Sequence, residues 1–245
     1  MIIVYTCITG SYDTLIEQPV FEGVKYVCFA DSLKPGMFKN WEVLPIKNGI
    51  SDFPNIINRH YKILPFSLFP NEDYSLYIDG NILLKDSPVK LLDNFKNSGA
   101  SIACFKHPDR KFLADELAAC IAQNKLQGSE ITAAKNFLQQ IEEEGFTSPR
   151  ELVAGYIILR KHEDLNLVQA MRSWLQIVEN KIKRDQISLV YSLWREDVAI
   201  AYLDDWVIPN KFFTRLHHGK YFSWLPIVIQ DFFKKALFKS KELIS

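Results

Sequence analysis

The sequence lacks a long hydrophobic run, a paired cysteine motif and an excess of charge of either sign. No apolar stretch reaches the roughly 20 residues that a transmembrane helix needs, and the chain starts with a strand-like segment rather than a basic leader. Its 29 basic and 29 acidic residues cancel, which argues against a protein whose main partner is nucleic acid. We therefore expect a cytoplasmic protein that contacts a membrane at most peripherally.

Cysteine is scarce and widely spaced, and no C-x-x-C pair is present. Most of these cysteines lie inside apolar runs, where a reduced thiol behaves as a small hydrophobe. The pattern predicts free thiols in a reducing compartment. The four residues are Cys7, Cys28, Cys104 and Cys120.

The chain is long and apolar enough for one large α/β domain, with 245 residues of which 48% are hydrophobic and 24% charged. No internal repeat or low-complexity linker interrupts it. The predicted strands are Ile2 to Ile8, Val24 to Phe29, Trp41 to Ile46, Leu76 to Ile78, Ser101 to Phe105, Leu152 to Leu159 and Trp206 to Ile208. The predicted helices are Asp52 to Leu64, Pro88 to Phe95, Phe112 to Lys125, Glu130 to Glu144, Asp164 to Asn180 and Gln186 to Trp194.

An apolar strand-like run ends at Asp79. Side chains alternate between the faces of a strand, so Asp79 and Asn81 can point the same way across Gly80 and offer oxygen to one cation. Magnesium and manganese are commonly held by one or two carboxylates together with substrate phosphates. Asp-Gly between apolar residues is also typical of a hairpin turn, which would leave Asp79 facing solvent.

Other polar groups follow predicted strands or share a helix face. Thr9-Gly10 and Asp31 end the first two strands, where open α/β sheets bind ligands. Arg59 and Lys62 lie three residues apart on one helix face, which suits phosphate oxygens or Asp79 but is also compatible with an ordinary solvated surface.

The ordered set of these segments resembles the nucleotide-sugar glycosyltransferases of the GT-A fold. In particular, it resembles the hexosyltransferase-like family of plant cell-wall proteins and bacterial polysaccharide loci. The matching segments, in order, are Tyr5 to Asp13, Tyr26 to Asp31, Arg59 to Lys62, Tyr77 to Asn81, His107-Pro108, Gly155, Arg184 to Gln186 and His217-His218. The resemblance implies a single GT-A-like, Rossmann-like domain over residues 1–220, with a mostly parallel central sheet flanked by helices.

The resemblance also implies a donor site for a nucleotide diphosphate sugar. The nucleoside would contact the backbone at the end of the first strand and Asp31, and the diphosphate would meet basic side chains. Gly155, an isolated glycine inside a strand, would mark close approach of a ligand or another backbone. The implied residues are Thr6, Ile8, Thr9, Gly10, Asp31, Arg59, Lys62, Gly155 and Lys220.

A divalent cation, Mn²⁺ or Mg²⁺, is implied at Asp79 and Asn81, completed by His217 or His218. The family's usual Asp-x-Asp is reduced here to Asp79-Gly80-Asn81, which removes one formal charge from the metal site.

Asp185, Gln186 and Arg59 are the predicted catalytic residues. In an inverting enzyme Asp185 would take the proton of the acceptor hydroxyl, whereas in similar retaining enzymes an Asp-Gln pair lies beside the donor sugar. A plain helix N-cap is the alternative for Asp185.

We thus predict hexosyl transfer to a glycan or lipid-linked glycan in polysaccharide biosynthesis. The alternatives are a degenerate glycan- or nucleotide-binding module and a sugar-phosphate nucleotidyltransferase, although Thr9 to Tyr12 lacks the glycine-rich, arginine-containing loop expected of the latter. The aromatic and basic segment 221–245 predicts an amphipathic helical tail that either lies on an anionic membrane surface or docks on its own domain.

Overall fold

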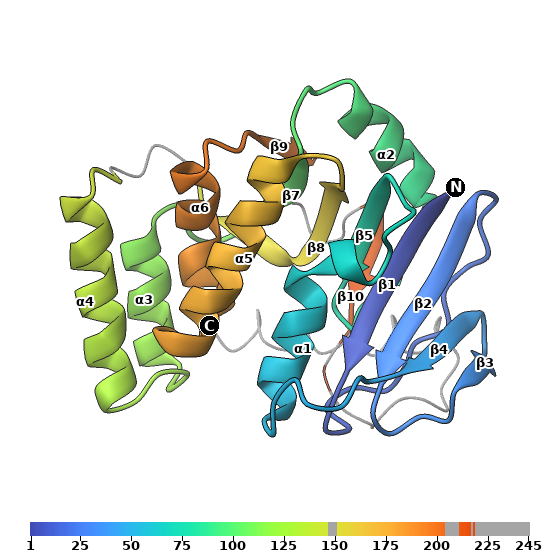
Figure 1. The fold of residues 1–245 in the computed structure, drawn as a ribbon, viewed down its shortest axis with the longest axis horizontal. Coiled ribbons are helices and arrows are strands. Elements are labelled where there is room, and N and C mark those ends of the chain that lie inside the picture. The colour runs from blue at the N-terminus through green and yellow to red at the C-terminus, as the bar shows by residue number, and fades with distance from the viewer. Residues whose placement is uncertain (147–150, 204–210, 217, 219–245) are drawn as a thin grey trace, which may run out of the picture.

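The structure is a computed structural model that describes residues 1–146, 151–203, 211–216 and 218 (Figure 1). An eight-stranded sheet runs through it in the order β3-β4-β2-β1-β5-β8-β7-β9, and β6 pairs with β10 in a second small sheet. The strands are β1 (Ile2–Ile8), β2 (Val24–Ala30), β3 (Gly36–Phe38), β4 (Trp41–Pro45), β5 (Tyr74–Ile78), β6 (Ile82–Leu84), β7 (Ile102–Lys106), β8 (Val153–Lys161), β9 (Ile200–Leu203) and β10 (Phe213–Arg215).

The large sheet is mostly parallel, as the sequence predicts. Strands β4, β2, β1 and β5 are neighbours in one direction, whereas β3 and β8 run antiparallel to their partners. The carboxyl ends of β1 and β5 therefore meet at the same sheet edge. The amino end of β8 also lies there, because β8 runs the opposite way beside β5.

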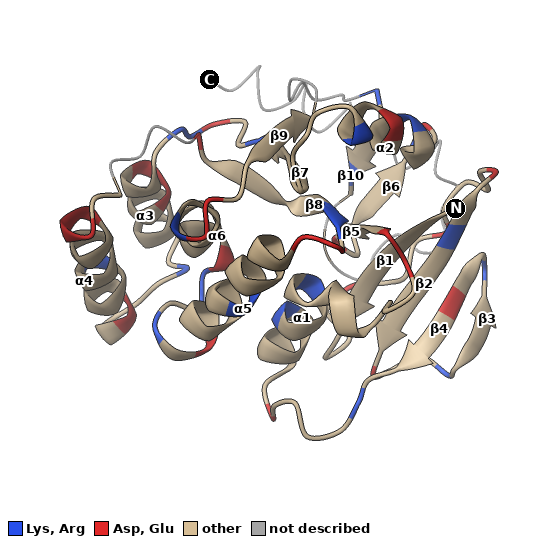
Figure 2. Cartoon of the chain, turned by 45° about the horizontal axis from the view of Figure 1, so that its top comes forward, with Lys and Arg blue, Asp and Glu red and all other residues tan. Residues whose placement is uncertain are grey.

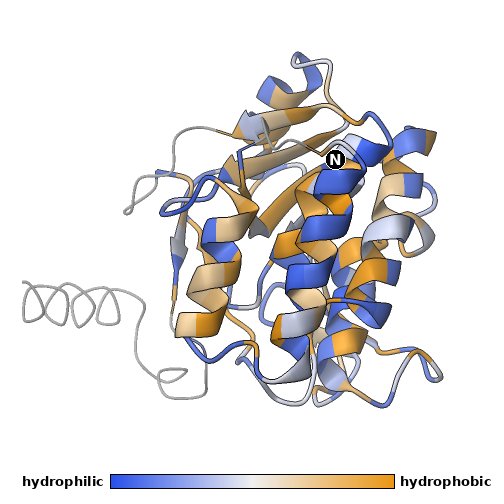
Figure 3. Cartoon of the chain, turned by 90° about the vertical axis from the view of Figure 1, so that its left-hand side faces the viewer, coloured by the Kyte–Doolittle hydropathy of each residue, from blue (hydrophilic) through white to orange (hydrophobic). Residues whose placement is uncertain are grey.

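Helices pack on both faces of this sheet. They are α1 (Pro54–Ile63), α2 (Pro88–Lys96), α3 (Leu113–Ala122), α4 (Ser129–Glu143), α5 (Leu165–Asn180) and α6 (Asp185–Arg195), with a 3₁₀ turn over Pro65–Ser67. All lie within a few residues of the predicted helices. Figure 3 shows orange and blue bands along them, as expected of helices with one buried and one solvated side.

The alternation of side chains along β1 creates two separate cores. Ile3, Tyr5 and Cys7 face the core formed with α1 and α3 to α6, whereas Ile2 and Val4 face the core formed with α2 and the small sheet. The buried residues of the helices supply the opposing surfaces, so the single sheet is covered on both sides.

Two predicted helix starts are confirmed at the level of capping. The Ser87 hydroxyl accepts from the Val89 amide before Pro88 opens α2, and Asp164 accepts from the amides of Asn166 and Leu167 before α5.

Four short strands escape sequence prediction, namely β3, β6, β9 and β10. Each has three or four residues, and β6 forms only because Leu83 pairs with Thr214 from far along the chain. The hairpin interpretation of the Asp-Gly pair is wrong for the same reason. Strand β5 lies between β1 and β8, whereas β6 pairs with β10, so the two strands on either side of the turn do not pair with each other.

All four cysteines are buried free thiols, as predicted. Within the described residues, no helix has the length and apolar character needed to cross a membrane. Several predicted features lie outside the described residues, namely the strand Trp206 to Ile208, His217, Lys220 and the segment 221–245. The membrane contact and the domain boundary at residue 220 therefore stay predictions.

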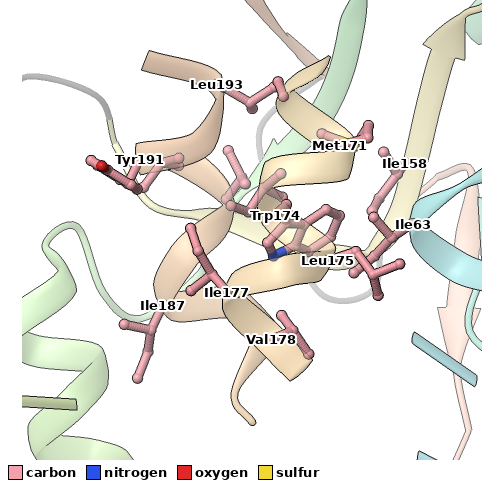
Figure 4. Close-up of a cluster of buried hydrophobic side chains, with 14 of the residues drawn as sticks. Ile63, Ile158, Met171, Trp174, Leu175, Ile177, Val178, Ile187, Tyr191 and Leu193 are labelled. Atoms are coloured by element: carbon pink, nitrogen blue, oxygen red, sulfur yellow. The ribbon is translucent and has the colours of Figure 1, made fainter. Parts of the chain in front are cut away.

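Trp174 anchors the contact between α5 and α6 (Figure 4). Its side chain is fully buried, and its ring Nε1 donates to the Asp185 carbonyl at 2.8 Å. We expect Trp174→Ala to lower the free energy of unfolding by about 3–5 kcal/mol, because it leaves a large cavity. Trp174→Phe keeps an aromatic ring but removes the hydrogen bond and part of the ring volume, so it should cost less, about 1–3 kcal/mol. Urea unfolding measures both, and a loss below about 1 kcal/mol for the alanine variant would contradict the assigned packing role.

Candidate functional site

A cavity of about 960 Å³ opens at the edge where β1 and β5 end and β8 begins. Side chains from α1, the loop after β1, the turn after β5 and the start of α6 line it. The sheet thus brings together segments that lie more than 100 residues apart in the sequence, such as Lys62 and Asp185, whose side chains hydrogen-bond across a separation of 123 positions.

Asp79 occupies the position after the last residue of β5. Its amide donates to the Tyr156 carbonyl at 2.9 Å, which continues the pairing with β8 and fixes the backbone. The carboxylate accepts from the Tyr77 hydroxyl at 2.9 Å and lies 3.7 Å from Lys62 Nζ. One side of Asp79 is therefore held by the protein, while about a third of its side chain stays exposed to the cavity.

Asn81 is buried and fixes the late part of the chain. Its backbone carbonyl accepts from the Leu216 amide, and its side-chain Nδ2 donates to the Leu216 carbonyl, both at 2.7 Å. His218 is placed by this clamp, with Nε2 at 3.4 Å from Asn81 Nδ2. Within the described part of the chain, the buried Asn81 Oδ1 has no hydrogen-bond partner.

Asp13 belongs to this group, although the sequence analysis gave it no role. A carboxylate oxygen lies 3.0 Å from His218 Nδ1, and hydrogen bonding to Asp13 raises the pKa of His218 against the effect of burial. A Cβ on Gly80 would lie only 3.1 Å from Asp13 Oδ2, so the glycine permits this close approach. The position of Asp13 in the loop after β1, at the same sheet edge as Asp79, is the sequence signal that could have identified it as a site residue.

Arg59 and Lys62 of α1 point toward Asp185, and Figure 2 shows basic residues on this helix. Lys62 Nζ lies 2.7 Å and Arg59 Nε 3.3 Å from the same oxygen, Asp185 Oδ2. Burial alone would raise the pKa of Asp185, but these two cations outweigh it and hold the pKa well below its usual range. The solvated-face interpretation of α1 is wrong for Lys62, which is 4% exposed.

Asp185 is the first residue of α6 rather than its N-cap, a position that Arg184 takes. Gln186 follows it and donates from Nε2 to the Val153 carbonyl at 3.3 Å. Gly155 lies in β8 where the pairing with β7 shifts register, and a Cβ there would lie 3.5 Å from Lys62 Nζ. The neighbour of Gly155 is thus the Lys62 side chain at an ordinary contact distance, and the close approach of a ligand or another backbone stays a prediction.

The predicted nucleoside contacts are only partly at the cavity. Ile8, Thr9 and Gly10 line it, and the Thr9 hydroxyl donates to the Pro54 carbonyl at 2.7 Å. Thr6 does not line the cavity, because it lies inside β1 and is 1% exposed. The predicted nucleoside contact at Thr6 is therefore wrong. Asp31 is exposed and accepts from the Gly10 amide at 2.7 Å, which holds the loop after β1.

The described residues contain no cluster of three or more His, Cys, Asp or Glu side chains arranged for a metal ion. What the site offers is the Asp79 carboxylate, the unpartnered Asn81 Oδ1 and the His218 imidazole, beside the cations of α1. Such a set is incomplete by itself and suits a metal that a bound diphosphate also ligates.

Comparison with known proteins agrees with this geometry. Residues 1–205 match the TOD1/MUCI70 glycosyltransferase-like domain. A curated relative, described as the probable hexosyltransferase MUCI70 of Arabidopsis thaliana, is 30% identical over 148 residues, which cover 56% of this chain and 24% of the relative. The chain thus spans about a quarter of the length of that relative.

Several solved glycosyltransferases show a distant likeness. An active-site mutant of LgtC has a TM-score of 0.46 at 11% identity over 82% of this chain and 72% of LgtC. Mouse xyloside xylosyltransferase 1 has a TM-score of 0.44 at 11% identity over 83% and 84% of the two chains. Likeness at this level says nothing about activity. From the match over residues 1–205, the chain belongs to the TOD1/MUCI70 glycosyltransferase-like domain family.

Proposed function

We propose that the protein transfers a hexosyl unit from a nucleotide diphosphate sugar to a hydroxyl of a glycan. The observation that carries the proposal is the meeting, in one cavity of a glycosyltransferase-like domain, of a partly exposed carboxylate, an unpartnered amide oxygen and an imidazole. The groups are those of Asp79, Asn81 and His218.

The same three residues fit Mn²⁺ or Mg²⁺. Asp79 supplies the charge, Asn81 Oδ1 is a buried acceptor whose hydrogen-bonding capacity a cation would satisfy, and neutral His218 is a competent ligand for a manganese-like ion. A bound metal of this kind would offset the charge that develops on the leaving diphosphate. Asn81 in place of a second carboxylate makes the site less charged, so we expect weaker metal binding than at a two-carboxylate site.

Lys62 and Arg59 provide positive charge for the donor diphosphate on the α1 side of the cavity. Lys62 Nζ already bridges Asp79 and Asp185, so its charge lies between the proposed metal ligands and the start of α6. Cations fixed at this position stabilise negative charge without moving during the reaction. We assign them to the diphosphate and to the orientation of Asp185.

The ion pairs of Asp185 favour a place beside the donor sugar over a general base. A carboxylate whose pKa is held low by two cations accepts a proton poorly near neutral pH. Asp185 would instead hold the sugar in position with Gln186 next to it. Product stereochemistry, read by NMR of the new glycosidic bond, tests this assignment, because an inverted product would require a separate base.

Donor binding is the direct test of the proposed function. We expect at least one nucleoside diphosphate, from a panel of the common bases, to bind in calorimetry with Mn²⁺ and at least tenfold more weakly after chelation of the metal. The matching nucleotide sugar should then release nucleoside diphosphate on incubation with acceptor glycans. Binding without release over the full panel would indicate a nucleotide-binding module, and no binding at all would refute the proposal.

A further inference from the structure

The cavity continues past Asp185 to a second end that the donor assignment does not use. This end is formed by Lys125 after α3, Glu130 in the first turn of α4, and Lys183 and Arg184 in the turn before α6. We call these four residues the basic end. Figure 2 shows basic residues in the turn between α5 and α6.

The basic end carries a surplus of positive charge. Lys183 Nζ pairs with its one acidic member, Glu130, at 3.2 Å. In the part of the chain that the structure describes, no acidic side chain forms an ion pair with Lys125 or Arg184. The adjacent Asp185 interacts with Arg184 but is also paired with Lys62 and Arg59, so it offsets only part of the charge of the basic end.

Arg184 is held in place from behind by a buried network. Glu116 is 2% exposed, pairs with Arg110 and accepts from the Cys120 thiol at 3.4 Å. Arg184 lies against the same Cys120 thiol. Burial and Glu116 raise the pKa of this thiol, and the charge of Arg184 lowers it in part. The Arg184 Nε is itself buried without a hydrogen-bond partner among the described residues.

Arg184 also provides the N-cap position of α6 and makes no side-chain capping bond there. The first turn of a helix exposes amide groups and a positive partial charge, which adds to the attraction of an anion. The Arg184 guanidinium, the Lys125 side chain and the first turn of α6 therefore line one end of the cavity, across Asp185 from the proposed metal ligands.

We propose that the basic end is the acceptor subsite and that it takes a glycan bearing a carboxylate or a phosphate close to the accepting hydroxyl. The assignment rests on the proposed function, since the donor fills the end lined by Asp79 and Asn81. Arg184 forms a forked contact with the anionic group, and Lys125 contributes a point charge from the rim.

The test compares glycans that differ only in charge. The probes are a hexuronic-acid oligosaccharide, its carboxyl-reduced neutral counterpart, and a phosphorylated form of that neutral chain. Calorimetry on the full chain without donor should give at least tenfold tighter binding for one or both charged probes, with a gap that narrows as salt is raised. The charged probe that binds identifies carboxylate or phosphate as the anionic group. Equal binding of neutral and charged glycans, or binding of none, overturns the proposal.

Matched variants locate the effect at the basic end. Lys125→Gln should weaken binding of the charged glycan about fivefold, and Glu130→Gln should strengthen it by a similar factor, with little change for the neutral glycan. Lys90→Gln, on the exposed face of α2, serves as the control and should change neither. Equal effects of Lys125→Gln and Lys90→Gln would overturn the assignment.

Nucleoside diphosphate binding separates this proposal from the proposed function. It should be unchanged in Lys125→Gln, and a loss there would place Lys125 with the donor and overturn the acceptor assignment. Failure of the wild-type protein to bind any nucleoside diphosphate would refute glycosyl transfer, while a charge-dependent glycan affinity would still stand.

Discussion

Asp79→Ala is expected to reduce turnover by on the order of 10³-fold while leaving the fold intact. The carboxylate is the one acidic group of the Asp79, Asn81 and His218 set, so without it the metal and the diphosphate lose their main anchor. The fold should survive, because the side chain is partly exposed and the backbone of residue 79 keeps its bond to Tyr156. Steady-state release of nucleoside diphosphate measures the effect, and thermal unfolding checks the fold.

Asp73→Ala is the matched control for this experiment. Asp73 precedes the same strand β5 at its opposite end and is exposed. Its backbone carbonyl accepts from the His162 amide, a bond that alanine keeps, and its carboxylate has only a minor electrostatic effect on His162. The Asp73→Ala variant should retain wild-type turnover. An Asp79→Ala enzyme that keeps more than about a tenth of the activity would remove Asp79 from the metal site.

Asp185→Asn is expected to reduce both activity and stability. The substitution leaves Lys62 and Arg59 beside a neutral amide, and loss of one partner from a buried ion pair typically costs about 3–5 kcal/mol. Turnover should fall by on the order of 10²-fold, because both cations then lose their fixed positions beside the donor. Urea unfolding and steady-state kinetics measure the two effects, and Asp93→Asn on the exposed face of α2 should change neither.

The same ion pairs predict how stability depends on pH. Because the pKa of Asp185 is lowered in the folded state, its contribution is fully present above the unfolded value of about 3.9 and is lost as pH falls below it toward the folded value. The wild-type protein should therefore lose more stability than Asp185→Asn between about pH 5 and pH 2. Parallel stability curves for the two proteins over this range would show that Asp185 is not held as the structure indicates.

Local patterns predicted the regular elements well where they were long and had clear ends. Ser87-Pro88 and Asp164 mark their helix starts through short-range hydrogen bonds that need no other part of the chain. The buried β1 is visible as an apolar run because both of its faces pack against other layers. Strand β6 has no such signal, since three residues acquire strand geometry only through β10.

The residues of the candidate site show the same difference between local patterns and tertiary contacts. Residue type and position predict Asp79, Asn81, Arg59 and Lys62, because a carboxylate after a strand and cations on one helix face are local patterns, whereas Asp185 is predicted from the family resemblance. All five line the cavity. Asp13 was missed and Thr6 was wrongly included, because exposure depends on what packs against a loop or strand.

The sequence by itself determined the helices, the longer strands and the absence of a paired cysteine motif, and it predicted the ends of β1 and β5 as the place for chemistry. Only the tertiary structure decided that Lys62 pairs with both Asp79 and Asp185, that Asn81 clamps Leu216 beside His218, and that Lys125 meets Arg184 in the same cavity. The physical reason is the range of the interactions. Backbone preferences and caps act over a few residues, whereas these contacts join segments that meet only after the sheet has ordered its strands and the helices have packed on it.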